Sequence, residues 1–164
     1  MAVLLGAVFF LSLPGTLLWQ RVVQDAGHGP VFAGIAIALL LMRAPPAGAV
    51  VRPVSAYGRA FAWAAAIGVV TELVQYSMPG RSVSLMDALH DVAGAALGLA
   101  VVWFIERRLA GGRGDAADKS CTRAVVAIAL LAFTILAWQP LQCARAYAAR
   151  NAAFPTLVPT HPLA

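Results

Sequence analysis

The sequence contains few charged residues. Only 12% of its 164 residues are Asp, Glu, Lys or Arg, about half the share of a typical soluble domain. In contrast, 61% are hydrophobic, and the mean hydropathy is +0.80. This composition argues strongly against a soluble globular domain and excludes a disordered chain, which needs low hydrophobicity and high charge. Because a spanning helix takes about 20 residues, the length accommodates four to six spans and no separate soluble catalytic domain.

Several functional signatures are also missing. The two cysteines, Cys121 and Cys143, are too few for a disulfide framework and form no C-x-x-C pair. There is no phosphate-binding loop, dinucleotide-binding glycine pattern or nucleophile elbow. No segment interleaves basic and aromatic residues as nucleic-acid-binding proteins do. We therefore expect no nucleic-acid partner and no cofactor. We also expect no metal site, because the His, Asp and Glu spacings match no common metal-binding motif.

Apolar runs predict an all-α fold, a polytopic transmembrane helix bundle of about five spans. The runs cover residues Ala2–Trp19, Val31–Met42, Ala60–Met78, Leu85–Ile105 and Ala124–Trp138. The first run lacks the features of a cleaved signal peptide, so we interpret it as a retained helix. The second and fifth are short for spans, and we expect Pro30 in the first turn of the second helix, with His28 in the turn before it.

These runs divide the chain into three predicted regions. Residues 1–110 form a four-helix membrane region, and residues 111–123 form a polar cytoplasmic linker. Residues 124–164 form a fifth transmembrane helix and an extracytoplasmic tail. The linker belongs to a strongly polar stretch, Glu106–Arg123, that carries eight charged residues.

The distribution of basic residues predicts the orientation in the membrane. The stretch Arg43–Arg59 contains three Lys or Arg residues and Glu106–Arg123 contains five, whereas the other side holds four. Because basic residues collect in cytoplasmic loops, we predict a cytoplasmic N-terminus and an outward-facing C-terminus. Cys121 and Cys143 then lie on opposite sides of the membrane. The net charge of +5 is thus interpreted as an orientation signal.

Polar side chains interrupt the apolar pattern between Thr71 and Gly98. Ionisable groups within a bilayer are costly, so they face the helix bundle or a wet cavity. The third and fourth spans are joined by a short Pro-Gly-Arg turn, which makes them antiparallel neighbours. Their polar residues are therefore predicted to form one cluster near the outer face, consisting of Glu72, Gln75, Arg81, Asp87, His90 and Asp91, with His28 as a further candidate from the turn between the first two spans.

Two interpretations of this cluster remain open. The acids and Arg81 could pair with one another as a structural clamp, or the cluster could bind a ligand or carry out acid–base chemistry. Gly94 and Gly98 form a G-x-x-x-G motif, which indicates close helix packing within the chain or a homodimer face.

The segment from Glu72 to Gly98 resembles the VanZ-like family of small bacterial membrane proteins. The family pattern is approximately E-x-x-Q, a P-G-R turn, and D-x-x-x-N-x-x-G-x-x-x-G. The matching positions are Glu72, Gln75, Pro79, Gly80, Arg81, Asp87, Gly94 and Gly98. One position departs from it, because Asp91 stands where the family usually has Asn, and His28 corresponds to a His that the family tends to carry near its second span. The resemblance implies a multi-pass protein of the bacterial inner membrane and an association with low-level teicoplanin resistance, and it establishes no reaction.

Four functional hypotheses follow. The first is a non-enzymatic envelope protein whose cluster binds a lipid head group, a lipid-linked cell-wall precursor or a lipophilic glycopeptide, with Arg81 contacting an anion. The second is an intramembrane enzyme acting on a lipid-linked substrate, with Glu72 or Asp91 as general base and His90 or His28 as its proton partner. A transporter is disfavoured by the absence of inverted repeats. The fourth is an assembly subunit that uses the glycine face.

Overall fold

The computed structural model describes residues 18–45, 49, 51–77, 85–111 and 116–153. It contains helices α2 (Leu18–Leu41), α3 (Val54–Tyr76), α4 (Leu85–Leu109) and α5 (Ala116–Ala153). No strand occurs among these residues, which agrees with the predicted all-helical fold.

Three helices are long and apolar enough to cross a membrane. The candidate spans are Val54–Val74, Leu85–Leu109 and Asp118–Ala153, and the apolar part of α2, Ala26–Leu41, is shorter. In a bilayer an α-helix satisfies its own backbone hydrogen bonds, which is why such runs fold as helices there. Nearly all of the predicted first span, Ala2–Trp19, lies outside the described residues, so the count of about five spans and the orientation stay predictions.

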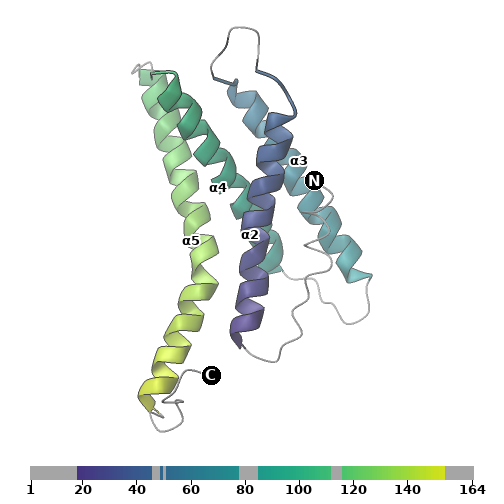
Figure 1. Ribbon diagram of the computed structural model, residues 1–164, viewed down its shortest axis with the longest axis vertical. Helices are drawn as coiled ribbons and strands as arrows, with labels where there is room; N and C mark the ends of the chain where they lie inside the picture. The colour runs from purple at the N-terminus through teal and green to yellow at the C-terminus, as the bar shows by residue number, and fades with distance from the viewer. Residues whose placement is uncertain (1–17, 46–48, 50, 78–84, 112–115, 154–164) are drawn as a thin grey trace, which may run out of the picture.

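The four helices alternate in direction along the long axis of the molecule (Figure 1). The end of α2 and the start of α3 lie at the same end of the bundle as the end of α4 and the start of α5. The two basic stretches of the sequence therefore share one end. Helix α4 packs most extensively against α2 and also contacts α3 and α5, so it is the central element.

The α2–α4 interface is built on small residues. A Cβ atom at Gly94 would overlap the backbone carbonyl of Gly29, and one at Gly98 would lie 2.9 Å from Cα of Ala33. The two residues of the G-x-x-x-G motif thus let α4 approach the backbone of α2 within the same chain, as small residues do in membrane helix pairs.

An apolar core fills the space around this contact. The fully buried side chains of Phe32 and Ile35 on α2 pack with Ala64 on α3 and with Ala95 and Leu99 on α4. Gly111 follows the C-terminal end of α4. Its φ of 76° is the left-handed conformation that glycine commonly adopts after a helix. Arg107 and Arg108 in the last turn of α4 complement the helix dipole.

The predicted turn at Gly27–Pro30 is wrong. Helix α2 runs without a break from Leu18 through His28 and Pro30 to Leu41. His28 is therefore a helical residue, and Pro30 lies inside the helix rather than in its first turn. Glycine and proline usually interrupt helices, but tertiary packing overrides that local propensity here. Gly29 is the contact point for α4, and membrane helices tolerate proline.

Two helix boundaries also differ from the prediction. Helix α3 begins at Val54 rather than Ala60, directly after Pro53. Helix α5 begins at Ala116, inside the predicted linker, and continues through Pro140 to Ala153 in the predicted tail. Only 6% of the most apolar stretch of α5 is buried. Most of its surface therefore faces outward from the bundle. In a membrane such apolar side chains would contact lipid.

Candidate functional site

The centre of the site is a hydrogen bond between α2 and α4. Nδ1 of His28 lies 2.9 Å from Oδ1 of Asp91, and the two side chains are 9% and 1% exposed. Because a carboxylate oxygen only accepts, Nδ1 of His28 carries a proton and donates it to Oδ1 of Asp91. Asp91 lies six residues after the start of α4, about 9 Å along the helix axis. The pair is therefore inside the bundle rather than at its surface.

The second carboxylate oxygen of Asp91 faces α3. A Cβ atom added to Gly68 would lie 3.2 Å from Oδ2 of Asp91 and 3.4 Å from the ring of Phe32. The absence of a side chain at Gly68 thus makes room for the carboxylate where three helices meet. Among the described residues, this buried Oδ2 has no hydrogen-bond donor. Buried polar atoms without partners are rare, and each one calls for an explanation such as a bound ligand.

Two more acids belong to the same region. Glu72 is 6% exposed on α3, one helical turn beyond Gly68, and Asp87 is half-buried one turn before Asp91 on α4. The negative charges of Asp91, Asp87 and Glu72 all act on the His28 imidazole. The structure therefore brings His28, Glu72, Asp87 and Asp91 together at the junction of α2, α3 and α4, although they come from segments far apart in the sequence.

His90 lies on another side of α4 from Asp91. Successive residues on a helix are about 100° apart, and α4 faces α2 along Gly94 and Gly98, so Asp91 and His90 point to opposite sides of that line. The imidazole of His90 still acts electrostatically on the Asp91 carboxylate. His90 is completely buried, and neither of its ring nitrogens has a hydrogen-bond partner among the described residues.

Two members of the predicted cluster cannot be placed. Arg81 lies outside the described residues, as does the Pro-Gly-Arg turn. Gln75 belongs to α3, but its side chain also lies outside the description. Their roles in the cluster stay predictions.

A second polar network, which the sequence analysis did not predict, lies at the opposite end of α4. Glu106 is 8% exposed and forms an ion pair with Arg52. Its Oε2 also accepts hydrogen bonds of 2.9 Å from the backbone N–H of Arg52 and 2.8 Å from the Tyr57 hydroxyl. The network ties the segment before α3 to α4, and it lies 15 residues, about 22 Å, from Asp91.

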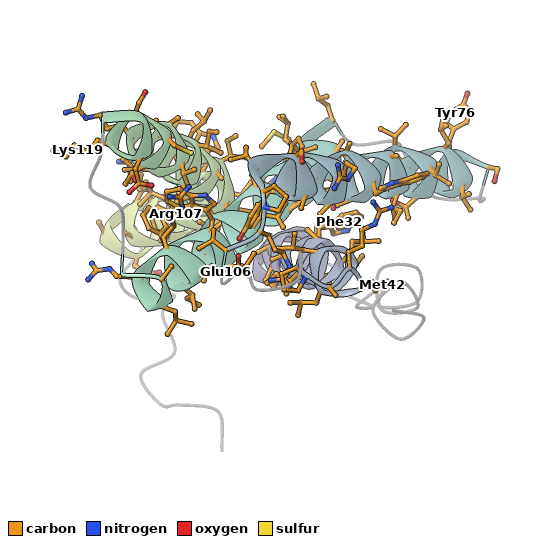
Figure 2. The ribbon with its side chains drawn as sticks, turned by 90° about the horizontal axis from the view of Figure 1, so that it is seen from above. Phe32, Met42, Tyr76, Glu106, Arg107 and Lys119 are labelled. Atoms are coloured by element: carbon orange, nitrogen blue, oxygen red, sulfur yellow. The ribbon has the colours of Figure 1, made fainter. Side chains whose placement is uncertain are left out.

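The next residue of α4 turns to the other neighbour. Arg107 forms an ion pair with Asp118 of α5, and its guanidinium lies 5.0 Å from the centroid of the Trp103 ring. Figure 2, which looks along the bundle, shows Glu106 and Arg107 on different sides of α4, with Arg107 toward α5. At this end of the bundle, ion pairs thus join α4 both to the segment before α3 and to α5.

An apolar cavity of about 270 Å³ lies between α3, α4 and α5. Its lining includes Tyr57, Phe61, Leu99, Trp103 and Val125, and none of the residues of the His28–Asp91 junction. It is thus separate from the candidate site. Within the described part of the chain, no group of three or more His, Cys, Asp or Glu side chains is arranged to hold a metal ion.

Comparison with known proteins adds no relatives. No protein-family model, curated protein or solved structure matches the chain. The functional interpretation therefore depends on the residues and their geometry.

Proposed function

We propose that the protein is a VanZ-like, multi-pass protein of the bacterial inner membrane that binds the polar group of an amphipathic envelope molecule. The binding site is the junction of His28, Glu72, Asp87 and Asp91, with Arg81 and Gln75 as further members. Its ligand is a lipid head group, a lipid-linked cell-wall precursor or a lipophilic glycopeptide, and glycopeptide binding would give low-level teicoplanin resistance.

The observation that carries this proposal is Oδ2 of Asp91, which has no hydrogen-bond donor within the described part of the chain. Placing a carboxylate inside a membrane bundle is costly, and a purely structural clamp would be expected to satisfy both of its oxygens. His28 occupies Oδ1 only. Oδ2 of Asp91 can accept a further hydrogen bond, so the ligand group that matches it is a donor, such as an ammonium or a hydroxyl. Two further acids nearby favour a donor that carries positive charge.

The proposal is tested with Asp91→Leu, which removes both carboxylate oxygens. The wild type and the variant are produced in a teicoplanin-susceptible bacterium, and susceptibility is measured together with the amount of protein in the membrane. We expect the wild type to lower susceptibility and Asp91→Leu to abolish that effect at normal abundance. Asp118→Leu, which removes a carboxylate at the other end of the bundle, is the matched control and should retain the effect.

Two results would count against the proposal. If the wild type leaves susceptibility unchanged, the glycopeptide is not the ligand. If Asp91→Leu and Asp118→Leu lose abundance and effect equally, the His28–Asp91 pair acts as a structural clamp.

One observation favours a second candidate, an intramembrane enzyme acting on a lipid-linked substrate. Asp91 fixes the His28 ring through Nδ1, which is how a carboxylate orients an imidazole that acts as a general base through Nε2. In this alternative, Asp91 and Glu72 provide the negative charge and His28, rather than His90, is the proton partner, because His90 faces the other side of α4.

His28→Asn separates the two candidates. The Asn side chain keeps an N–H that donates to Oδ1 of Asp91, and it leaves Oδ2 in place as an acceptor, but an amide cannot take up a proton. Binding should survive this change, whereas turnover by an acid–base pair should fall by a factor of about 10² to 10⁴.

A further inference from the structure

A small cavity lies between the end of α2 and the start of α3, and two arginines line it. Its volume is about 170 Å³, and the arginines are Arg43, just after the end of α2, and Arg59 on α3. The other lining residues are apolar, among them Leu40, Ala60 and Trp63, and none is acidic. The cavity therefore combines two positive charges with an apolar wall.

The charges of these two arginines are not neutralised within the described part of the chain. At the same end of the bundle, Arg52 and Arg107 form ion pairs with acids of the protein. Arg43 and Arg59 take part in no ion pair or side-chain hydrogen bond with another described residue. The segment from Arg43 to Arg59 also contains no Asp or Glu. An anion from outside the chain is therefore the matching partner.

The cavity lies at the depth where a membrane presents its phosphate groups. Arg59 is five residues after the start of α3, about 8 Å along the helix axis, and belongs to the candidate span Val54–Val74. Trp63 follows one turn later and is 60% exposed, and tryptophan favours the boundary between head groups and hydrocarbon. An arginine near the end of a span extends its charge toward the head groups. This position favours a lipid phosphate as the anion.

A phosphodiester suits this arrangement of charges. Each of its two free oxygens can accept N–H bonds from one guanidinium, which is the side chain best suited to phosphate. The buried side chains of Leu40 and Ala60 offer an apolar wall to the atoms next to the phosphate. Pockets for small molecules commonly measure about 300–1,000 Å³, so a cavity of about 170 Å³ holds the phosphate and its neighbouring atoms and leaves the acyl chains on the outer surface.

We propose that Arg43 and Arg59 form a binding site for the phosphate of an anionic phospholipid, in the cavity between α2 and α3. Anionic lipids are preferred over zwitterionic ones, because a head group that carries its own cation is repelled by two guanidinium groups. Basic pockets between membrane helices bind anionic head groups on the cytoplasmic side, which is where the predicted orientation places this cavity. None of the residues of the His28–Asp91 junction lines it, so the proposal does not depend on the function proposed above.

Native mass spectrometry of the full-length protein in detergent tests the site. The protein is titrated with phosphatidylglycerol, which is anionic, with phosphatidylcholine, which is zwitterionic, and with inorganic phosphate. We expect phosphatidylglycerol to bind with saturation and more tightly than either of the others. Arg43→Gln and Arg59→Gln should each weaken this binding about fivefold, which is the effect of one basic residue at the membrane surface.

The matched control is Arg123→Gln. Arg123 is an exposed residue near the start of α5, at the same end of the bundle, and it does not line the cavity. Its substitution lowers the net charge by the same amount and should leave the affinity for phosphatidylglycerol unchanged. Because Arg43 and Arg59 are exposed as well, all three variants should keep the unfolding temperature of the wild type in detergent alone, so a loss of lipid binding reports on the site.

Three results would overturn the proposal. Equal losses of affinity in Arg59→Gln and Arg123→Gln would show that phosphatidylglycerol responds to the overall positive charge of this end of the bundle. Equal affinities of the wild type for phosphatidylglycerol and phosphatidylcholine would show that the two arginines do not select an anionic lipid. Inorganic phosphate that binds as tightly as phosphatidylglycerol, and displaces it, would show that the site takes a soluble phosphate rather than a lipid.

Discussion

His28 and Asp91 stand 63 residues apart in the sequence and share a buried hydrogen bond of 2.9 Å between α2 and α4. The bond depends on the close approach of the two helices, because Gly29, the residue after His28, lies directly against Gly94. The same small residues that pack the helices thus bring the imidazole and the carboxylate within reach of each other.

The first prediction concerns the energy of this pair. His28→Leu or Asp91→Leu alone leaves the other group buried without its partner, so each should lower the free energy of unfolding by about 1–3 kcal/mol. The double variant should be more stable than the sum of the single effects predicts, because neither polar group is then left behind. Unfolding in mixed micelles measures all four proteins. Strict additivity would show that the two side chains do not interact.

The second prediction concerns the G-x-x-x-G motif. Gly94→Val should destabilise the protein strongly, because its side chain would collide with the Gly29 backbone. The control is Gly58→Ala on α3, where an added Cβ meets nothing within 4 Å. This change should be neutral or stabilise the helix by up to about 1 kcal/mol.

Membrane abundance and size-exclusion chromatography distinguish packing within the chain from a homodimer. A contact within the chain predicts that Gly94→Val lowers abundance. If the variant instead keeps full abundance and converts a dimer to a monomer, the motif forms an interface between copies.

The third prediction compares the two networks at the other end of α4. Glu106→Leu leaves the Arg52 guanidinium and the Tyr57 hydroxyl without their acceptor, and this network is well buried. Asp118→Leu breaks the Arg107 ion pair, whose side chains are more exposed at 26% and 14%. Glu106→Leu should therefore lower the unfolding temperature more than Asp118→Leu, because exposed ion pairs contribute little. Equal losses would contradict the burial of Glu106.

The fourth prediction concerns orientation. Lys119 and Arg150 are exposed near opposite ends of α5, and the 31 residues between them span about 46 Å, more than the hydrocarbon core of a bilayer. In a background with Cys121 and Cys143 replaced by Ser, we expect a membrane-impermeant maleimide added to intact cells to label Arg150→Cys but not Lys119→Cys. The reverse pattern would place the basic loops outside and contradict the positive-inside assignment.

The sequence predicted the helical membrane fold because composition and apolar run length are averages over many residues. It failed at Gly27–Pro30, where the role of Gly29 in packing is visible only once α4 is in place.

The cluster was predicted in part: Glu72, Asp87 and Asp91 follow from helix spacing, and His28 joined them by family resemblance. For His90 the membership stays a prediction: it acts electrostatically on Asp91, and among the described residues its ring nitrogens have no hydrogen-bond partner.

The sequence analysis missed Glu106. It begins the strongly polar stretch Glu106–Arg123, so it was interpreted as one of several solvent-exposed charges. Its place just inside the end of a span could have indicated a buried pair with a loop arginine. Arg52 fills that role, but only the fold brings it next to α4.

The most direct test of the central claim, that Asp91 binds a polar group from outside the chain, is native mass spectrometry of the protein released from nanodiscs. The discs contain equal amounts of phosphatidylethanolamine, whose ammonium is a hydrogen-bond donor, and phosphatidylcholine, whose head group has no donor. We predict that the wild type retains phosphatidylethanolamine preferentially, that Asp91→Leu loses the preference, and that Asp118→Leu keeps it. Equal retention of both lipids by the wild type, or an unchanged preference in Asp91→Leu, would contradict the account.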